Sequence, residues 1–178
     1  NALEETLEIR KDIGYLPEHN PLYPQMFIKE YLEYVSGLYR LGNKTEERIH
    51  EVIDLTGLNK EKTKKIETLS KGYRQRLGLA QAIIHDPGVL ILDEPTTGLD
   101  PNQIAEIRSL ISRLGKEKTV LLSTHIMQEV EAICDRIIVI NNGRIVADDR
   151  VENISMKLQE NKQTVQVEFN REVKEDTL

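Results

Sequence analysis

A run of four apolar residues, 89–92, followed directly by Asp93 and Glu94, constrains the fold of this chain more than any other feature. The run is apolar at every position, which is typical of a parallel strand buried on both faces. Short apolar runs then alternate with stretches of helical spacing, giving helices at 101–114 and 126–134 and strands at 119–123 and 136–140. This alternation predicts an α/β fold in which a parallel sheet is flanked by helices.

The chain before this region is expected to be mostly helical. A short strand at 12–16 leads into helices at 25–41, 45–56 and 71–85, and the charged segment 60–67 is predicted as a solvated turn of helix. Gly42 and Gly57 are placed to end the first two helices in the left-handed conformation, and Thr45 or Lys44 to begin the second. Ser70 is the predicted N-cap of the third, which ends before Pro87.

The pattern divides the chain into four parts, and residues 24–86 form a helical unit inserted between two parts of the α/β region. The parts are 1–23, 24–86, 87–149 and 150–178. Asn142-Gly143 predicts a hairpin turn between two antiparallel strands. In the last part we expect an amphipathic helix to about residue 160, a strand at 164–169 and a polar end.

Composition excludes several classes of function. The net charge of −6 argues against a nucleic-acid-binding surface, which needs a basic face. Apolar runs such as 89–92 and 137–140 are far too short to span a bilayer, so any membrane connection is expected to go through a partner. The single cysteine, Cys134, excludes an intrachain disulfide framework and fits a reducing compartment.

Four polar side chains follow predicted strands and are candidates for a phosphate and magnesium site. Asp93 and Glu94 follow the strand at 89–92, His125 follows the strand at 119–123, and Glu18 follows the strand at 12–16. Ligands bind beyond the carboxyl ends of parallel strands. Asp93 suits Mg²⁺, Glu94 can accept a proton from water, and His125 can donate a hydrogen bond to phosphate. Taken singly, the Asp93-Glu94 pair and His125 are more often structural loop residues, and the convergence of four side chains from three strand ends carries the prediction.

The helix that opens at Ser70 is a candidate anion site. Its free N–H groups lie at the positive end of the helix dipole, and Lys71, Arg74 and Arg76 add positive charge in the first two turns. The alternative is an ordinary capped helix with a solvated basic face, and this segment alone does not decide between them.

Three segments together resemble the nucleotide-binding subunits of ATP-binding-cassette (ABC) transporters. They are Leu69-Ser70-Lys71-Gly72-Tyr73-Arg74-Gln75-Arg76, then 89–95 running into Gly98-Leu99-Asp100, and Ser123-Thr124-His125. The resemblance covers about 13–148, and the chain departs from it at Lys71 and Tyr73, where Gly and Gln are commonest. The loop within 13–23 further resembles the gliding-motility-associated exporter ATPases of the Bacteroidetes. The resemblance implies part of a P-loop NTPase core carrying an inserted helical subdomain.

The resemblance also implies roles for single residues. Asp93 would hold Mg²⁺ through water, Glu94 would be the catalytic base, and His125 would steady the γ-phosphate. Glu18 stands where the family has a glutamine that contacts Mg²⁺ and senses the γ-phosphate, and Asp100 would help link the two halves of a dimer.

Within the signature segment, the resemblance implies binding to ATP held by an opposing subunit. Ser70 and Gly72 carry this expectation, together with Lys71 and Gln75. The cofactors implied are ATP and Mg²⁺, and a working site needs two chains.

A second implied partner is a membrane permease subunit, whose cytoplasmic helix would enter a groove between Glu18 and the helical subdomain. Tyr15, Leu22 and Tyr23 are candidates for this contact, although core packing also explains Tyr15 and Leu22. The implied function is ATP hydrolysis that powers export through separate membrane subunits, with the protein cytoplasmic and peripheral at the inner face of the membrane.

A phosphate-binding loop of the form G-x-x-x-x-G-K-[S/T] does not occur in the 178 residues. The nearest sequence, 37–45, has one residue inserted before its lysine and follows a helix, so we interpret it as a helix end and linker. We therefore expect a segment of a longer protein that is inactive by itself. Two alternatives are a degenerate cassette acting as a regulatory or binding subunit, and an ABC protein of DNA repair or translation. The second is disfavoured because the chain has neither heptads nor a second signature segment.

Overall fold

The computed structural model describes residues 6–154, and the strand expected at 164–169 lies outside the described residues. The chain divides into two compact units, Asn1–Ile133 and Cys134–Leu178. The first unit contains every residue of the candidate site.

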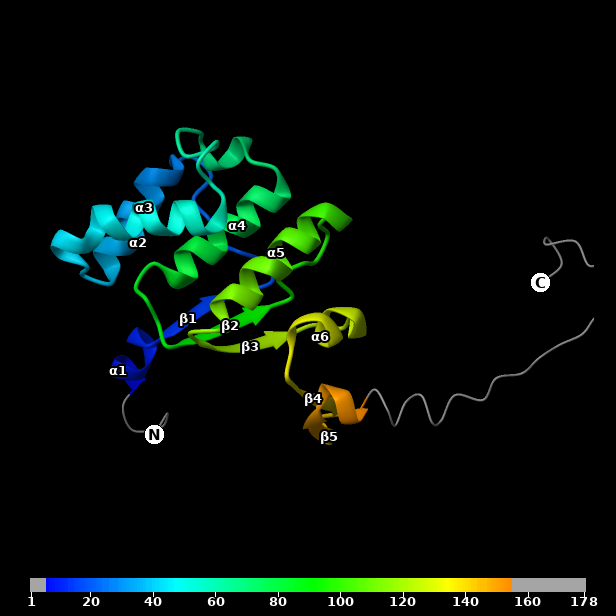
Figure 1. The fold of residues 1–178 in the computed structure, drawn as a ribbon. Helices are drawn as coiled ribbons and strands as arrows, with labels where there is room; N and C mark the ends of the chain where they lie inside the picture. Colours follow the sequence, from blue (N-terminus) through cyan, green and yellow to red (C-terminus); the bar gives the residue numbers. More distant parts are fainter. Residues whose placement is uncertain (1–5, 155–178) are drawn as a thin grey trace, which may run out of the picture. The chain divides into compact units, whose positions relative to one another are not determined.

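A three-stranded parallel sheet lies at the base of the first unit (Figure 1). Its strands are β1 (Ile13–Leu16), β2 (Val89–Asp93) and β3 (Thr119–Ser123), in the order β1-β2-β3. The register aligns Leu16 with Leu92, and Leu92 with Leu122, so the strands end together. The predicted parallel sheet and the central place of the run at 89–92 are confirmed.

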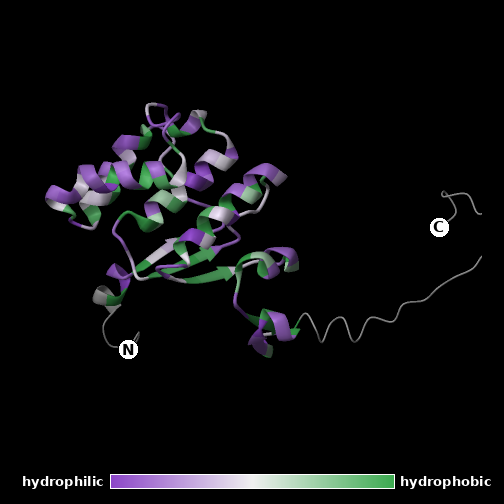
Figure 2. Cartoon of the chain, viewed as in Figure 1, coloured by the Kyte–Doolittle hydropathy of each residue, from purple (hydrophilic) through white to green (hydrophobic). Residues whose placement is uncertain are grey.

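The two faces of this sheet differ. On one face Leu16, Leu90 and Leu92 are fully buried beneath the helices α4 (Lys71–Ile83) and α5 (Pro101–Leu114), and β2 and β3 are coloured mainly as hydrophobic in Figure 2. On the other face, Tyr15 is 50% exposed and Leu121 is 56% exposed. The explanation of Tyr15 by core packing is therefore wrong, because side chains alternate along a strand and the described residues cover only one face. Leu22 does pack against the core as a partly buried residue.

Three helices between β1 and β2 share a core with the sheet. They are α2 (Ile28–Leu38), α3 (Thr45–Thr56) and α4, with a 3₁₀ turn η1 (Gly42–Lys44) between α2 and α3, while α1 (Thr6–Lys11) precedes β1. One cluster of buried residues runs from α2 and α3 through α4 to β2 and α5. The helix predicted at 45–56 has the bounds expected from the sequence, whereas α2 is shorter than predicted at both ends and α1 was not predicted.

The predicted end of α2 at Gly42 is wrong. Arg40 has a φ of +57° and takes the left-handed position instead. The Leu41 N–H donates to the Ser36 carbonyl at 3.1 Å and the Arg40 N–H to the Gly37 carbonyl at 3.1 Å, which together form a Schellman motif. Gly42 is also left-handed, but it begins η1 rather than ending α2.

We expect Arg40→Gly to raise the free energy of unfolding by about 0.5–1 kcal/mol, because a left-handed residue other than glycine is strained. Urea denaturation of the complete protein that contains this chain measures the change. The control is Arg40→Ala, which removes the same side chain and keeps the strain. Equal stability of the two variants would contradict the argument.

The segment 60–67 does not form the predicted turn of helix. It makes turns that lead into a 3₁₀ helix, η2 (Ile66–Thr68), and Ile66 is 1% exposed. The Ile28 N–H donates to the Lys64 carbonyl and the Ile66 N–H to the Met26 carbonyl, so this backbone pairs with the start of α2. The lysines of this segment are exposed, as its charge predicted. The path of its backbone instead follows the burial of Ile66.

α4 begins as predicted at Ser70, whose Oγ accepts a hydrogen bond from the Tyr73 N–H at 3.4 Å. It ends at Ile83, two residues earlier than expected, and Asp86 before Pro87 has a φ of +56°. The Arg48 guanidinium from α3 donates to the carbonyls of Ile83 and Ile84, which satisfies groups that a continued helix would have bonded.

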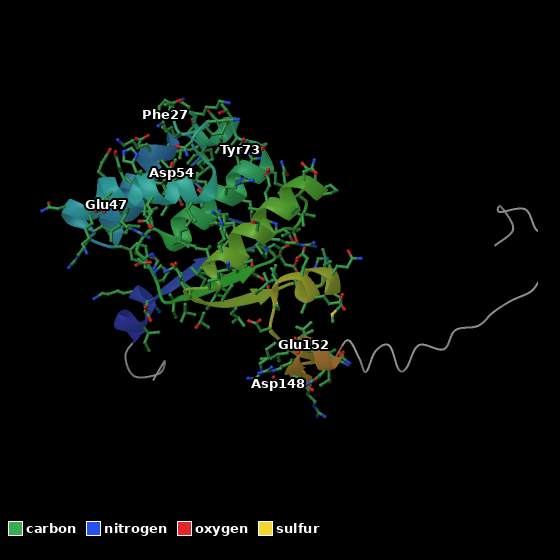
Figure 3. The ribbon with its side chains drawn as sticks, in the orientation of Figure 1. Phe27, Glu47, Asp54, Tyr73, Asp148 and Glu152 are labelled. Atoms are coloured by element: carbon green, nitrogen blue, oxygen red, sulfur yellow. The ribbon has the colours of Figure 1, made fainter. Side chains whose placement is uncertain are left out.

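The second unit contains the predicted hairpin. β4 (Arg136–Asn141) and β5 (Arg144–Arg150) are antiparallel, and both turn residues, Asn142 and Gly143, have positive φ. This is the geometry that favours Asn-Gly in a two-residue hairpin loop. Arg136 forms two hydrogen bonds to Asp148, which is labelled in Figure 3. A helical turn at 151–154 follows, as expected, and its continuation lies outside the described residues.

Candidate functional site

The carboxyl ends of β2 and β3 bring two predicted site residues into direct contact. Glu94 Oε1 lies 2.8 Å from His125 Nδ1, although the two residues are 31 positions apart in the chain. The Glu94 N–H donates to the Ser123 carbonyl at 3.1 Å, so the parallel pairing continues one residue past β2. This places Glu94 and His125 on the same edge of the sheet, as the sequence predicted.

Glu94 is held in an unusual backbone conformation at that edge. Its φ is +47°, and the Thr97 hydroxyl donates to Glu94 Oε2 at 3.0 Å. The side chain of Glu94 is 18% exposed, whereas that of His125 is 73% exposed. The pair is therefore fixed on the Glu94 side and open to solvent on the His125 side.

The contact has an electrostatic consequence for His125. Its pKa is raised above the usual value, mainly because of the hydrogen bond and charge of Glu94, with smaller contributions from Glu129 and Glu18. A neighbouring carboxylate favours the protonated imidazole. His125 in this state presents a positive charge and a second N–H donor, which are the groups that bind a phosphate oxygen.

Asp93 and Glu18 occupy different surroundings. Asp93 is the last residue of β2, and its Oδ1 accepts a hydrogen bond from the Ser123 hydroxyl. Glu18 lies in the loop after β1, and its Oε2 is 4.0 Å from Nδ1 of its neighbour His19. Of the four predicted residues, three are thus adjacent along two strand ends, and Glu18 acts on His125 only at a distance. Within residues 6–154 the structure contains no group of three or more His, Cys, Asp or Glu side chains that could hold a metal ion.

Glu18 instead lines a cavity of about 220 Å³ between the β1 loop and the start of α4. Lys71, Arg74 and Gln75 line the same cavity. Gln75 is 9% exposed, so it faces the interior of the unit rather than an outer surface.

The start of α4 packs closely against the loop that follows Glu94. A Cβ added to Gly98, which has a φ of +71°, would collide with Lys71 Nζ. A Cβ on Gly72 would meet the Gln103 side chain of α5 at 2.7–2.9 Å. Ser70 is exposed, whereas Gly72 is buried. The predicted nucleotide-binding segment therefore presents Ser70 and Lys71 outward and uses Gly72 for close packing.

Two further predicted residues have local structural partners. Asp100 is the N-cap of α5, and its Oδ1 accepts from the Gln103 N–H at 3.0 Å. Arg76 donates to the Thr56 carbonyl at 2.9 Å and forms an ion pair with Glu106. The expectation that Arg76 contributes to the anion site is wrong, because its position on α4 directs it toward α3 and α5.

The sequence did not predict Glu129, which lies beneath this site. Glu129 belongs to α6 (Met127–Ile133) and is 1% exposed. The signal was present in the spacing: residues 126, 129, 130 and 133 share one helical face, and the other three are apolar. A carboxylate at such a position is unusual unless it is paired.

In the described part of the chain, no helix is long and apolar enough to cross a membrane.

Comparisons with known proteins show which family this chain resembles. The family model described as "ABC transporter" matches residues 2–97. The ABC transporter ATP-binding protein YxlF of Bacillus subtilis is 37% identical over 159 residues, covering 89% of this chain and 54% of its own. The Nod factor export ATP-binding protein I of Rhizobium etli is 37% identical over 147 residues, covering 82% and 46%.

Among solved structures, cbiO1 from Clostridium perfringens, described as part of the ABC transporter complex cbiONQ, has a TM-score of 0.76 at 27% identity and covers 86% of this chain and 62% of its own. This likeness confirms the predicted α/β fold class. The chain spans about half the length of the curated relatives that it matches. The resemblance to gliding-motility exporters in particular stays a prediction.

Proposed function

The chain belongs to the ABC transporter ATP-binding family, and from this premise we propose that the complete protein hydrolyses ATP to power transport through membrane subunits. Glu94 is the general base of the reaction, and His125 steadies the γ-phosphate. The contact between Glu94 and His125 at 2.8 Å carries this proposal, because it joins the two groups at the ligand-binding edge of a parallel sheet.

The geometry supports these roles through charge and position. Phosphoryl transfer to water depends chiefly on positioning and on neutralising the developing charge. Thr97 and His125 fix the carboxylate of Glu94, and a carboxylate has more acceptor positions than the two that these partners use. The imidazole of His125 is exposed and its pKa is raised, so it can approach a bound phosphate as a cation.

The residues present also fit Mg²⁺ as a cofactor. This ion is commonly held by one or two carboxylates and completed by water and substrate phosphates, so it does not require a three-carboxylate cluster. Asp93 supplies a carboxylate fixed by Ser123, with Glu18 as a second, more distant candidate. When bound, Mg²⁺ supplies neutralisation of phosphate charge.

The exposed start of α4 supports a second copy of the protein as a partner. Ser70 and Lys71 face outward at the positive end of a helix of 13 residues, and such a helix start binds phosphate well. Ser70 and Lys71 would act on ATP held by the opposing subunit, while Gly72 allows the helix start to pack against Gln103, and Asp100 lies in the same loop as Gly98, which Lys71 contacts.

Exposed aromatic residues beside the cavity at Glu18 support a permease subunit as the other partner. Tyr23 is 50% exposed and packs edge-to-face on Tyr34 at 5.5 Å between ring centroids. Exposed, rigid aromatic side chains are common at protein interfaces. The name of the Rhizobium etli relative includes export, and we propose the same direction here, at the inner face of the membrane.

ATP hydrolysis by the complete protein tests the proposal. We expect magnesium-dependent release of phosphate by the complete protein. The segment 1–178 contains no G-x-x-x-x-G-K-[S/T] loop, and we expect it to show neither hydrolysis nor micromolar binding of Mg-ATP by calorimetry. A complete protein that binds Mg-ATP without hydrolysing it would support a degenerate regulatory cassette instead. Micromolar binding by the segment would overturn the second expectation.

A further inference from the structure

A buried carboxylate outside the reacting groups connects the two loops that carry them. Glu129 on α6 is 1% exposed, and both of its carboxylate oxygens accept hydrogen bonds. Glu129 Oε1 accepts from the Thr96 hydroxyl at 2.6 Å, and Oε2 accepts from the Thr124 hydroxyl at 3.0 Å. Arg108 on α5 places its guanidinium 3.6 Å from Oε1. The carboxylate thus has partners on three different segments.

Each threonine lies beside one of the residues proposed to react. Thr96 is two residues after Glu94 and is 3% exposed. Thr124 directly precedes His125, and its hydroxyl also accepts from the Ile126 N–H at 3.2 Å. Glu129 therefore bonds to the loop of Glu94 with one oxygen and to the loop of His125 with the other.

The hydrogen bonds to Glu129 hold the two threonines in fixed positions. Hydrogen bonds to a carboxylate are shorter and stronger than those between neutral groups. In a buried network, a polar group that loses its partner cannot bond to water instead, so the loss is costly. The network therefore favours the one arrangement in which every member keeps its partner. Thr96 accordingly cannot shift relative to Thr124 without breaking a bond to Glu129.

We propose that Glu129 is a positioning residue that fixes the loop of Glu94 against the loop of His125, so that these two side chains meet. Glu129 bonds to their neighbours and not to the pair itself. The kinetic test of this inference rests on the proposed ATP hydrolysis. The structural claim itself concerns only the contact between Glu94 and His125.

The experiment compares Glu129→Ala with Glu129→Gln in the complete protein. Both variants remove the charge, but glutamine retains the size and one acceptor oxygen. We expect kcat for ATP hydrolysis to fall by up to about 10²-fold in Glu129→Ala with KM unchanged, because misplacing a reacting group by about 1 Å costs that much. Glu129→Gln should retain a larger part of the rate. Glu47→Gln, which makes the same chemical change at an exposed glutamate on α3, is the matched control and should change neither constant.

A second readout does not depend on hydrolysis. The pKa of His125, followed by NMR without nucleotide and assigned with His125→Asn, should fall toward its usual value in Glu129→Ala. The fall in the pKa of His125 should be nearly as large as in Glu94→Gln, which removes the main cause of the raised value. It should be larger than in Glu129→Gln, which removes the charge of Glu129 but keeps its size and one acceptor oxygen. The difference between the two Glu129 variants therefore measures the effect of lost geometry apart from lost charge. If the wild-type protein hydrolyses no ATP, the proposed function fails while this readout still decides the role of Glu129.

A merely structural role predicts a different set of results. Glu129→Ala would then lower the midpoint of thermal unfolding and leave kcat per folded molecule and the pKa of His125 as in the wild type, which overturns the proposal. Should Glu129→Ala fail to fold, Thr124→Val replaces it, because valine keeps the shape and removes one donor to Glu129. Thr124→Val with an unchanged pKa of His125 and an unchanged kcat also overturns it.

Discussion

Glu94→Gln is expected to lower kcat for ATP hydrolysis by the complete protein by about 10²–10⁴-fold, the usual contribution of a general base. Glutamine keeps the size of the side chain and can still accept from the Thr97 hydroxyl, but it cannot take a proton from water. Affinity for Mg-ATP, measured by calorimetry, should stay within a few-fold of the wild type because the charge on Asp93 remains. The pKa of His125 should fall in the same variant, since Glu94 is the main cause of its raised value.

The matched control is Glu47→Gln, which makes the same chemical change on the exposed surface of α3 (Figure 3). We expect the control to hydrolyse ATP at the wild-type rate. A Glu94→Gln protein that retains more than about a tenth of the wild-type kcat would rule out Glu94 as the base.

Gly14→Ala is expected to lower the free energy of unfolding by at least about 2 kcal/mol, in the upper part of the range for overpacked cores. A Cβ on Gly14 would collide with the Ala82 carbonyl oxygen of α4 and meet Leu90 Cδ2 at 2.7 Å. The Ala82 contact is with backbone, which cannot move aside as a flexible side chain can. Relief of the clash requires β1 to move away from α4, and this would stretch the 3.2 Å contact between His85 Nε2 and the Ile13 carbonyl.

Gly37→Ala provides the contrast for this prediction. Gly37 lies within α2, and a Cβ there would meet nothing within 4 Å. Because glycine is a poor helix former, alanine at this position should raise the free energy of unfolding by about 0.5–1 kcal/mol. Urea denaturation of both variants gives the comparison, and equal effects at the two glycines would contradict the packing argument.

The site shows which inferences a sequence allows. Glu94 and His125 could be brought together from the sequence because parallel strands share a direction, and residues one or two positions past each strand therefore reach the same edge. Glu18 also stands two positions past its strand, but the same rule placed it less well, because no pattern fixes the path of the chain once a strand has ended. Arg76 was misplaced for a related reason: charge near a helix start was identified, but not the face of the helix on which the guanidinium lies.

Periodicity and turn chemistry in this sequence were enough to determine the parallel strands, the N-cap at Ser70, the bounds of α3 and α5 and the Asn-Gly hairpin, because each depends on residues close together in the chain. Only the tertiary structure decided that Ile66 directs the segment 60–67 into the core, and that Glu129 bonds to Thr96 and Thr124. Those outcomes depend on which distant groups are buried together. Burial between segments far apart in the chain is a property of the packed molecule, and local sequence does not specify it.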